Sequence, residues 1–274
     1  MKSKLTVIVI AKNEAHNIVE CLQSVQFAQQ IVVVDGASTD GTVRLAQAQG
    51  ATVTVFSDWQ GFGAQKNRAL ALAQHEWVLS LDADERVPEH LALEIKAVLA
   101  EALEWDLAGN IGASVDAFDI PRLTQFCGTW IHHCGWTPDR VCRLFRRGQF
   151  EFSDDWVHER LVPLAGSKVN RATVGRLTTA MLHYSYRTPA DYWKKLQHYS
   201  HDWAVQRYAQ GRVTTLWRAI ASGGIAFVRS YFVRLGFLDG AMGFAVCLMQ
   251  AQAAYGKYFE LYCLCRTTAR QSDS

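Results

Sequence analysis

The chain has 274 residues, a hydrophobic fraction of 49% and a formal net charge of +2. This length fits one large domain, or one domain with an appendage, and is enough to bury a full hydrophobic core. The near-neutral charge argues against a dedicated nucleic-acid-binding protein, because such proteins carry a strong basic excess. The seven cysteines are scattered and odd in number, which does not indicate a disulfide framework.

The N-terminal segment predicts a buried strand. Its apolar run at residues 5–10 is too short for the hydrophobic region of a signal peptide, and no small-residue cleavage site follows it. We therefore expect the protein to stay in the cytoplasm.

Strand and helix signals alternate over the first hundred residues. Apolar, β-branched runs predict strands at 5–10, 31–34, 51–56 and 77–81. Helical spacing predicts helices at 14–25, from 42 to about 49, at 64–73, and from Pro88 onward. Short strands separated by helices indicate βαβ units and a mostly parallel sheet, so the predicted fold class is α/β.

The pattern changes at about residue 116. Residues 115–123 and 141–145 are predicted as strands of a mixed sheet edge, and a polar, aromatic stretch separates them. Residues 189–207 and 216–262 are predicted to be helical, and the second of these segments is apolar and rich in aromatics. We therefore expect a first domain at 1–187, with halves 1–110 and 111–187, and a helical extension at 188–274.

Acidic residues follow the predicted strands, where parallel α/β sheets bind their ligands. Asp82 and Asp84, two apart at a strand end, can reach one hard cation, which takes oxygen ligands and bridges diphosphate oxygens. A pair of loop-capping aspartates is the alternative. Asp35 can accept hydrogen bonds from a ribose or a base edge, whereas Asp40 is assigned to helix capping.

A basic cluster follows at residues 61–68. Lys66 or Arg68, near a helix start, can offset the charge of an anionic donor, and a solvated helix face is the alternative. The sequence has no GxGxxG after its first strand, which disfavours a dinucleotide-dependent oxidoreductase.

Four segments, taken in order, resemble the motifs of family 2 glycosyltransferases: 11–14 (AKNE), 34–42 (VDGASTDGT), 65–68 (QKNR) and 81–84 (LDAD). The resemblance implies a GT-A fold, transfer with inversion, a nucleotide-diphosphate sugar as donor, and Mg²⁺ or Mn²⁺ as cofactor. The half at 1–110 would then bind the nucleotide sugar, and the half at 111–187 would bind the acceptor.

The same resemblance implies roles for individual residues. Glu14 and Asp35 would bind the nucleoside, and Lys66 or Arg68 would line the base or diphosphate pocket. Asp82 would contact the ribose or the water shell of the metal. Asp84 would bind the metal directly.

Later segments resemble a narrower group, the bacterial lipopolysaccharide-core β-1,4-glucosyltransferases. These segments are 135–140 (GWTPDR), 143–147 (RLFRR), 156–159 (WVHE), 183–186 (HYSY) and 236–240 (GFLDG). In that group UDP-glucose is the donor and an inner-core heptose is the acceptor. The alternatives are a capsule, polyprenyl-phosphate or protein acceptor, or a non-catalytic protein that binds nucleotide sugars.

Inversion needs a general base on the acceptor hydroxyl, opposite the leaving diphosphate. Glu159 is the first candidate, in a position where the family often has an acidic pair, and Asp155 and His158 are the alternatives. His183 is the candidate for a further metal or phosphate contact, with a hydrogen-bonded structural role as the other interpretation.

The C-terminal segment has an excess of basic residues, although the net charge of the whole chain is close to neutral. Residues 207–262 carry six basic and two acidic side chains, with aromatic residues among them. Such a pattern on helices suits an anionic membrane surface. The longest uncharged stretch, 240–256, is too short to span a bilayer. We expect a peripheral enzyme on the inner face of the cytoplasmic membrane, near a lipid-linked acceptor; the alternative is that these helices pack on the catalytic domain or a second subunit.

Overall fold

The computed structural model describes residues 4–108, 115–153, 159–167 and 174–272. The chain divides into two compact units. The N-terminal unit comprises Met1–Arg122 and Arg140–His183, and the C-terminal unit comprises Leu123–Asp139 and Tyr184–Ser274. The predicted domain boundaries stay a prediction, because a compact unit is not thereby shown to fold alone.

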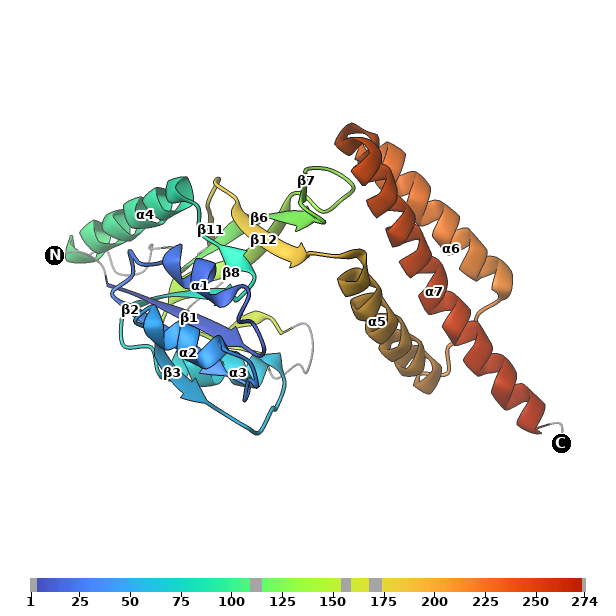
Figure 1. The fold of residues 1–274 in the computed structure, drawn as a ribbon, viewed down its shortest axis with the longest axis horizontal. Helices are drawn as coiled ribbons and strands as arrows, with labels where there is room; N and C mark the ends of the chain where they lie inside the picture. Colours follow the sequence, from blue (N-terminus) through green and yellow to red (C-terminus); the bar gives the residue numbers. More distant parts are fainter. Residues whose placement is uncertain (1–3, 109–114, 154–158, 168–173, 273–274) are drawn as a thin grey trace. The chain divides into compact units, whose positions relative to one another are not determined.

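The N-terminal unit begins with four parallel strands in the order β3-β2-β1-β4. Their bounds are β1 (Leu5–Ala11), β2 (Gln30–Asp35), β3 (Thr52–Val55) and β4 (Trp77–Asp82). The connecting helices are α1 (Ile18–Gln23), α2 (Thr42–Ala48) and α3 (Phe62–Ala71), and α4 (Glu89–Leu107) follows β4 (Figure 1).

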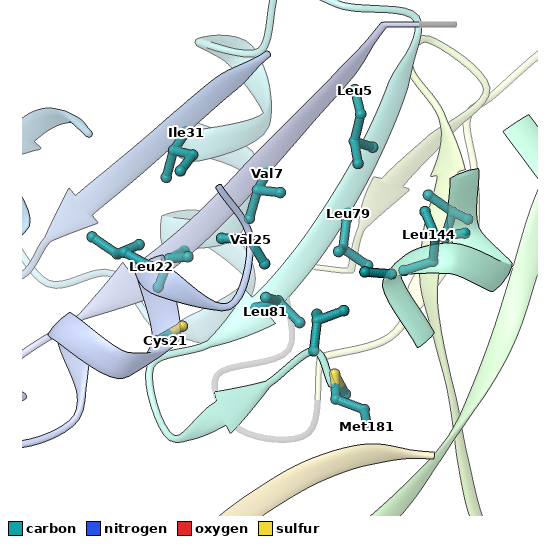
Figure 2. Close-up of a cluster of buried hydrophobic side chains, with 14 of the residues drawn as sticks. Leu5, Val7, Cys21, Leu22, Val25, Ile31, Leu79, Leu81, Leu144 and Met181 are labelled. Atoms are coloured by element: carbon teal, nitrogen blue, oxygen red, sulfur yellow. The ribbon is translucent and has the colours of Figure 1, made fainter. Parts of the chain in front are cut away.

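Both faces of β1, β2 and β4 are buried, which explains their continuous apolar sequences, whereas the edge strand β3 is partly exposed. Val7 and Val9 of β1 belong to a core cluster with α1 and α4, part of which is shown in Figure 2. Ile8 and Ile10 belong to a second cluster that includes Ala69 of α3. Side chains of a strand alternate between faces, so one apolar run supplies both layers.

The sheet continues with strands of mixed direction. β8 (Asp139–Arg146) pairs antiparallel with β4, and the order continues to β6 (Ala117–Phe126), β12 (Met181–Tyr186) and β5 (Glu85–Arg86). β7 (Thr129–Ile131) and β11 (Val174–Arg176) also pair with β6. β9 (Phe150–Phe152) and β10 (Leu161–Pro163) form a separate antiparallel pair. The predicted fold class, an α/β sheet flanked by helices with a C-terminal helical extension, is confirmed.

The C-terminal unit is mainly helical. α5 (Pro189–Ala209) starts with a capping box, in which Thr188 and Asp191 satisfy each other's backbone amides. α6 (Leu216–Val228) and α7 (Gly240–Ser272) pack closely against each other (Figure 1). At Gly223 of α6 the approach is so close that an added Cβ would lie 3.1 Å from the Cβ of Tyr255. Ser222 Oγ also donates a hydrogen bond of 3.0 Å to the carbonyl of Ala254.

The predicted helix at 216–262 is interrupted. A π turn, η2 (Arg229–Val233), and a 3-10 turn, η3 (Gly236–Asp239), separate α6 from α7. Leu235 has a φ of 54° and Gly240 a φ of 64°, and such left-handed residues cannot continue an α-helix. By length and hydropathy, no single described helix could span a membrane, whereas Leu216–Val233 and Gly236–Thr267, bent by 73°, meet the criteria only as a pair.

Candidate active site

The candidate site lies at the carboxyl edge of the parallel strands. Ala11 at the end of β1 is in register with Asp35 at the end of β2, and Ile10 is in register with Asp82 at the end of β4. The three strands therefore end together, and the polar residues that follow them share one edge of the sheet.

Asp35 closes the turn that follows β2. Its side chain is buried, and its carboxylate accepts hydrogen bonds from the amide (2.7 Å) and the hydroxyl (2.6 Å) of Ser38. Ser38 Oγ in turn accepts a hydrogen bond of 2.7 Å from the amide of Asn13, in the loop after β1. Asp35 thus joins the first two strand ends, and its contact with a nucleoside stays a prediction.

Glu14 and Asp40 form hydrogen bonds between the loop after β1 and the loop after β2. The Glu14 amide donates to Thr42 Oγ1 at 2.8 Å, and its carboxylate accepts a hydrogen bond from Asn17. Asp40 accepts hydrogen bonds from the amide of Thr42, in the first turn of α2, and from the amide of Ala15. The hydrogen bond from the Thr42 hydroxyl lowers the pKa of Asp40 below its ordinary value. Binding of a nucleoside by Glu14 stays a prediction.

The two basic candidates on α3 have different partners. Arg68 pairs with the carboxylate of Asp58 at 2.6 Å and lies over the ring of Phe56. Lys66 is only 2% exposed, and its Nζ lies 2.9 Å from Asp82 Oδ1. Of the two side chains, Lys66 is the one that the structure brings to the acidic strand end.

Lys66 also binds Glu159, the first candidate for the general base. The Nζ–Oε1 distance is 2.6 Å, and the side chain of Glu159 is 15% exposed. Gly63 of α3 permits this approach, since a Cβ there would lie 2.0 Å from the carbonyl oxygen of Ser153 and 3.5 Å from the Cβ of Glu159. The other two candidates, Asp155 and His158, lie outside the described residues.

Asp82 forms a second ion pair, with Arg143 of β8. Burial alone would raise the pKa of Asp82, but the charges of Arg143 and Lys66 outweigh it and hold that pKa well below its usual range. Arg143 also lies 2.8 Å from Glu85, which is fully buried and accepts a hydrogen bond from the Asp82 amide. Burial would lower the pKa of Arg143, yet the two carboxylates raise it.

These pairs form a chain of alternating charge that ends at Arg122, 3.3 Å from Glu85. We call it the charge network, and its members are Glu159, Lys66, Asp82, Arg143, Glu85 and Arg122. Sequence reasoning did not identify Glu85, Arg143 or Arg122 as site residues. The available signals were Glu85 directly after the LDAD motif and Arg143 within the otherwise apolar strand 141–145.

Arg86 fixes the turn that carries Asp84. It is buried, and it donates hydrogen bonds of 2.8 Å to the carbonyls of Ala83 and Asn17. Opposite this turn, the pairing of β5 with β12 sets His183 against Glu85. His183 Nε2 then lies 3.4 Å from Asp84 Oδ2, and both side chains are partly exposed.

The predicted metal ligands Asp82, Asp84 and His183 divide into two groups. Asp82 faces Lys66 and Arg143, whereas Asp84 and His183 face each other. In the part of the chain that the structure describes, no three His, Cys, Asp or Glu side chains are grouped to hold a metal. The Asp84 carboxylate nonetheless fits Mg²⁺ or Mn²⁺ if diphosphate oxygens and water complete the coordination, whereas the imidazole of His183 is a less usual ligand for such oxygen-preferring cations.

Two proteins similar to this chain over almost its whole length are named glycosyltransferases. The chain is 28% identical to the lipopolysaccharide core biosynthesis glycosyltransferase LpsC of Rhizobium meliloti, over 95% of this chain and 93% of LpsC. It is also 28% identical to an uncharacterized glycosyltransferase of Rickettsia bellii, over 100% of this chain and 92% of that protein.

Among solved structures, residues 1–349 of S. aureus TarS match with a TM-score of 0.45 and 16% identity, over 98% of this chain and 92% of that chain. Glucosyl-3-phosphoglycerate synthase from Mycobacterium tuberculosis, in complex with Mn²⁺ and UDP, matches with a TM-score of 0.33 and 21% identity, over 45% of this chain and 44% of that chain. The model of glycosyl transferase family 2 matches residues 6–147, more than half of the chain, and the protein belongs to this family.

Proposed function

We propose that the protein is an inverting, metal-dependent hexosyltransferase that transfers glucose from UDP-glucose to an inner-core sugar of lipopolysaccharide. The proposal depends above all on the arrangement at the strand ends. There Asp84 and His183 offer two ligands to a cation, and Lys66 holds the carboxylate of Glu159 at the same edge. The acceptor assignment is supported by the resemblance of the later segments and by the similarity to LpsC.

In this mechanism Glu159 acts on the acceptor. Its carboxylate takes the proton of the acceptor hydroxyl while the hydroxyl oxygen attacks the anomeric carbon. The bond between that carbon and the diphosphate oxygen breaks, the electron pair leaves with UDP, and the configuration inverts. Lys66 keeps Glu159 in place through its 2.6 Å contact.

The leaving UDP needs positive charge on the opposite side of the sugar. A divalent cation held by Asp84 and His183 would stabilise the charge that develops on the diphosphate. Asp82, fixed between Lys66 and Arg143, would keep the turn of Asp84 in position. Asp82 could also contact the ribose or the water shell of the metal, as the family resemblance implies.

We place this reaction on the inner face of the cytoplasmic membrane, where a lipid-linked acceptor would be found. The aromatic and basic composition of residues 207–262 supports the location. Fractionation of cells that express the full chain tests it. Recovery with the membranes is expected at low salt, and recovery wholly in the soluble fraction would contradict it.

The chemical test is release of UDP from a panel of UDP-sugars, with truncated core oligosaccharide as acceptor and with or without Mg²⁺ or Mn²⁺. Acceptor-dependent release from UDP-glucose is expected only with metal. Asp84→Ala should lower kcat/KM about a thousandfold, because cation stabilisation is worth several kcal/mol. Glu101→Ala, which removes an exposed carboxylate on α4, is the control.

Each other outcome has a defined meaning. Release of UDP from a different UDP-sugar alone would support the proposed transfer reaction and would overturn the assignment of glucose as the transferred sugar. Equal activity of Asp84→Ala and Glu101→Ala would overturn the metal assignment. No release with any donor, acceptor or metal would overturn the proposed reaction.

A further inference from the structure

The C-terminal unit contains a cavity lined mainly by α6 and α7, the orange and red helices of Figure 1. Its volume is about 570 Å³, and the loop at Cys134 and Gly135 completes the wall. Four cationic side chains line it: Arg218, Arg229, Arg234 and Lys257. Among the described lining residues none is acidic.

Neighbouring groups position three of these cations. Arg218 and Lys257 both lie over the ring of Tyr258, at 5.7 Å and 5.9 Å from its centroid. Arg234 lies against Gly135 and donates a hydrogen bond of 3.4 Å to its carbonyl. A Cβ at Gly135 would lie 2.4 Å from Cδ of Arg234, so the bare glycine leaves room for that side chain.

The positive charge in the cavity is not neutralised within the described protein. In the ranges that the structure covers, no carboxylate forms an ion pair with any of the four cations. The hydroxyls of Ser222 and Ser230, which also line the cavity, donate to helix carbonyls. Four like charges around one cavity repel one another, and an anion bound among them would relieve that repulsion.

Exposed apolar residues accompany the cations along the chain. Trp217 is 79% exposed and precedes Arg218, Ile225 is 67% exposed and lines the cavity, and Val233 is 73% exposed and precedes Arg234. A free phosphate ion would gain nothing from these side chains. A lipid would, because its phosphate can meet the cations while its acyl region covers the apolar groups.

We propose that this cavity binds the phosphorylated head group of an anionic membrane lipid. Arg229 and Arg234 contact the phosphate, and the exposed Ile225, which lines the cavity beside them, enters the boundary of the acyl chains. The proposal rests on the membrane location in the proposed function, and it is independent of the donor and acceptor sugars.

The test is sedimentation of the full chain with phosphatidylcholine vesicles that contain or lack phosphatidic acid. Binding is expected only with phosphatidic acid. The double variant Arg229→Ala/Arg234→Ala should bind about thirtyfold more weakly, since each basic residue at an anionic surface contributes about fivefold. The control, Arg212→Ala/Arg266→Ala, removes the same charge from the same unit outside the cavity and should lose less than about threefold. Circular dichroism confirms that each variant is folded.

A second measurement needs no variant. Short-chain, water-soluble phosphatidic acid should displace the wild-type protein from vesicles, and inorganic phosphate at the same concentration should not. Equal losses in the two double variants would mean a diffuse basic surface and would overturn the proposal, as would no binding to vesicles. Equal displacement by inorganic phosphate would mean a site for soluble anions and would also overturn it. Vesicle binding is measured without a sugar donor, so it can succeed or fail independently of the proposed transfer.

Discussion

The charge network of the N-terminal unit and the cavity of the C-terminal unit differ in how their charges are compensated. In the N-terminal unit Lys66, Arg143 and Glu85 are buried, and each has a partner of opposite charge. In the C-terminal unit Arg218 and Arg229 are exposed on the wall of a cavity whose described lining residues include no acidic side chain. Buried charge has to be compensated within the fold, because an unpaired buried charge is strongly destabilising. Exposed charge is already solvated and can be compensated by a ligand.

The largest effect on stability is expected when a buried cation of the charge network is removed. Arg143→Met leaves Asp82 and Glu85 facing each other with one cation fewer and should lower the free energy of unfolding by about 3–5 kcal/mol. Denaturant unfolding measures it. Arg147→Met, at an exposed position just after β8, should change stability by less than about 0.5 kcal/mol. Similar small losses in both variants would show that the network does not stabilise the unit.

The second effect is on catalysis. Glu159→Gln keeps the shape of the side chain and removes the base, so kcat should fall at least about a hundredfold while UDP binding persists. Single-turnover kinetics and calorimetric titration with UDP separate the two quantities. Glu151→Gln on β9 is the control. An unimpaired kcat would transfer the role of base to Asp155 or His158, whose substitutions would be compared next.

A third, smaller effect on stability is expected from replacing one glycine in each unit with alanine. Gly135 and Gly148 have φ values of 81° and 80°, so alanine should destabilise either position by about 1–2 kcal/mol. Only at Gly135 does the new Cβ meet a neighbour, Arg234. Gly135→Ala should therefore also weaken vesicle binding, and Gly148→Ala should not. Equal vesicle binding in both would argue that Arg234 does not contact the lipid.

The smallest expected effect depends on pH. Burial raises the pKa of Asp239, but hydrogen bonds from the side chain and backbone of His133 outweigh it and leave that pKa below its ordinary value. A carboxyl group whose pKa is lower in the folded than in the unfolded protein stabilises the fold. The stabilisation is complete at pH values above the unfolded pKa of about 4, and it is lost as the pH falls through the pKa of the folded protein.

Asp239→Asn should therefore lower the free energy of unfolding by about 1 kcal/mol near pH 7, and the deficit should vanish at low pH. Thermal unfolding of both proteins from about pH 7 to about pH 3 measures the difference. A deficit that stayed constant over this range would contradict the assignment.

Much of the sheet could be predicted because strand signals are local. The runs 5–10, 31–34 and 77–81 became Leu5–Ala11, Gln30–Asp35 and Trp77–Asp82. The predicted helix at 14–25 is shorter, Ile18–Gln23, and it follows a turn in which the backbone carbonyl of Glu14 accepts hydrogen bonds from the amides of Asn17 and Ile18. Strands β5 and β12 have weak signals, and each depends on its distant partner.

The sequence by itself determined the α/β fold class, the family resemblance and the acidic residues at the strand ends, because each follows from local periodicity or a short motif. Only the tertiary structure decided that Lys66, and not Arg68, lies at Asp82, and that Arg143 joins Asp82 to Glu85. Lys66 and Glu159 are 93 residues apart, and Asp82 and Arg143 are 61 apart. In a sequence a buried charge looks like a surface charge, and only the fold shows which opposite charge compensates it.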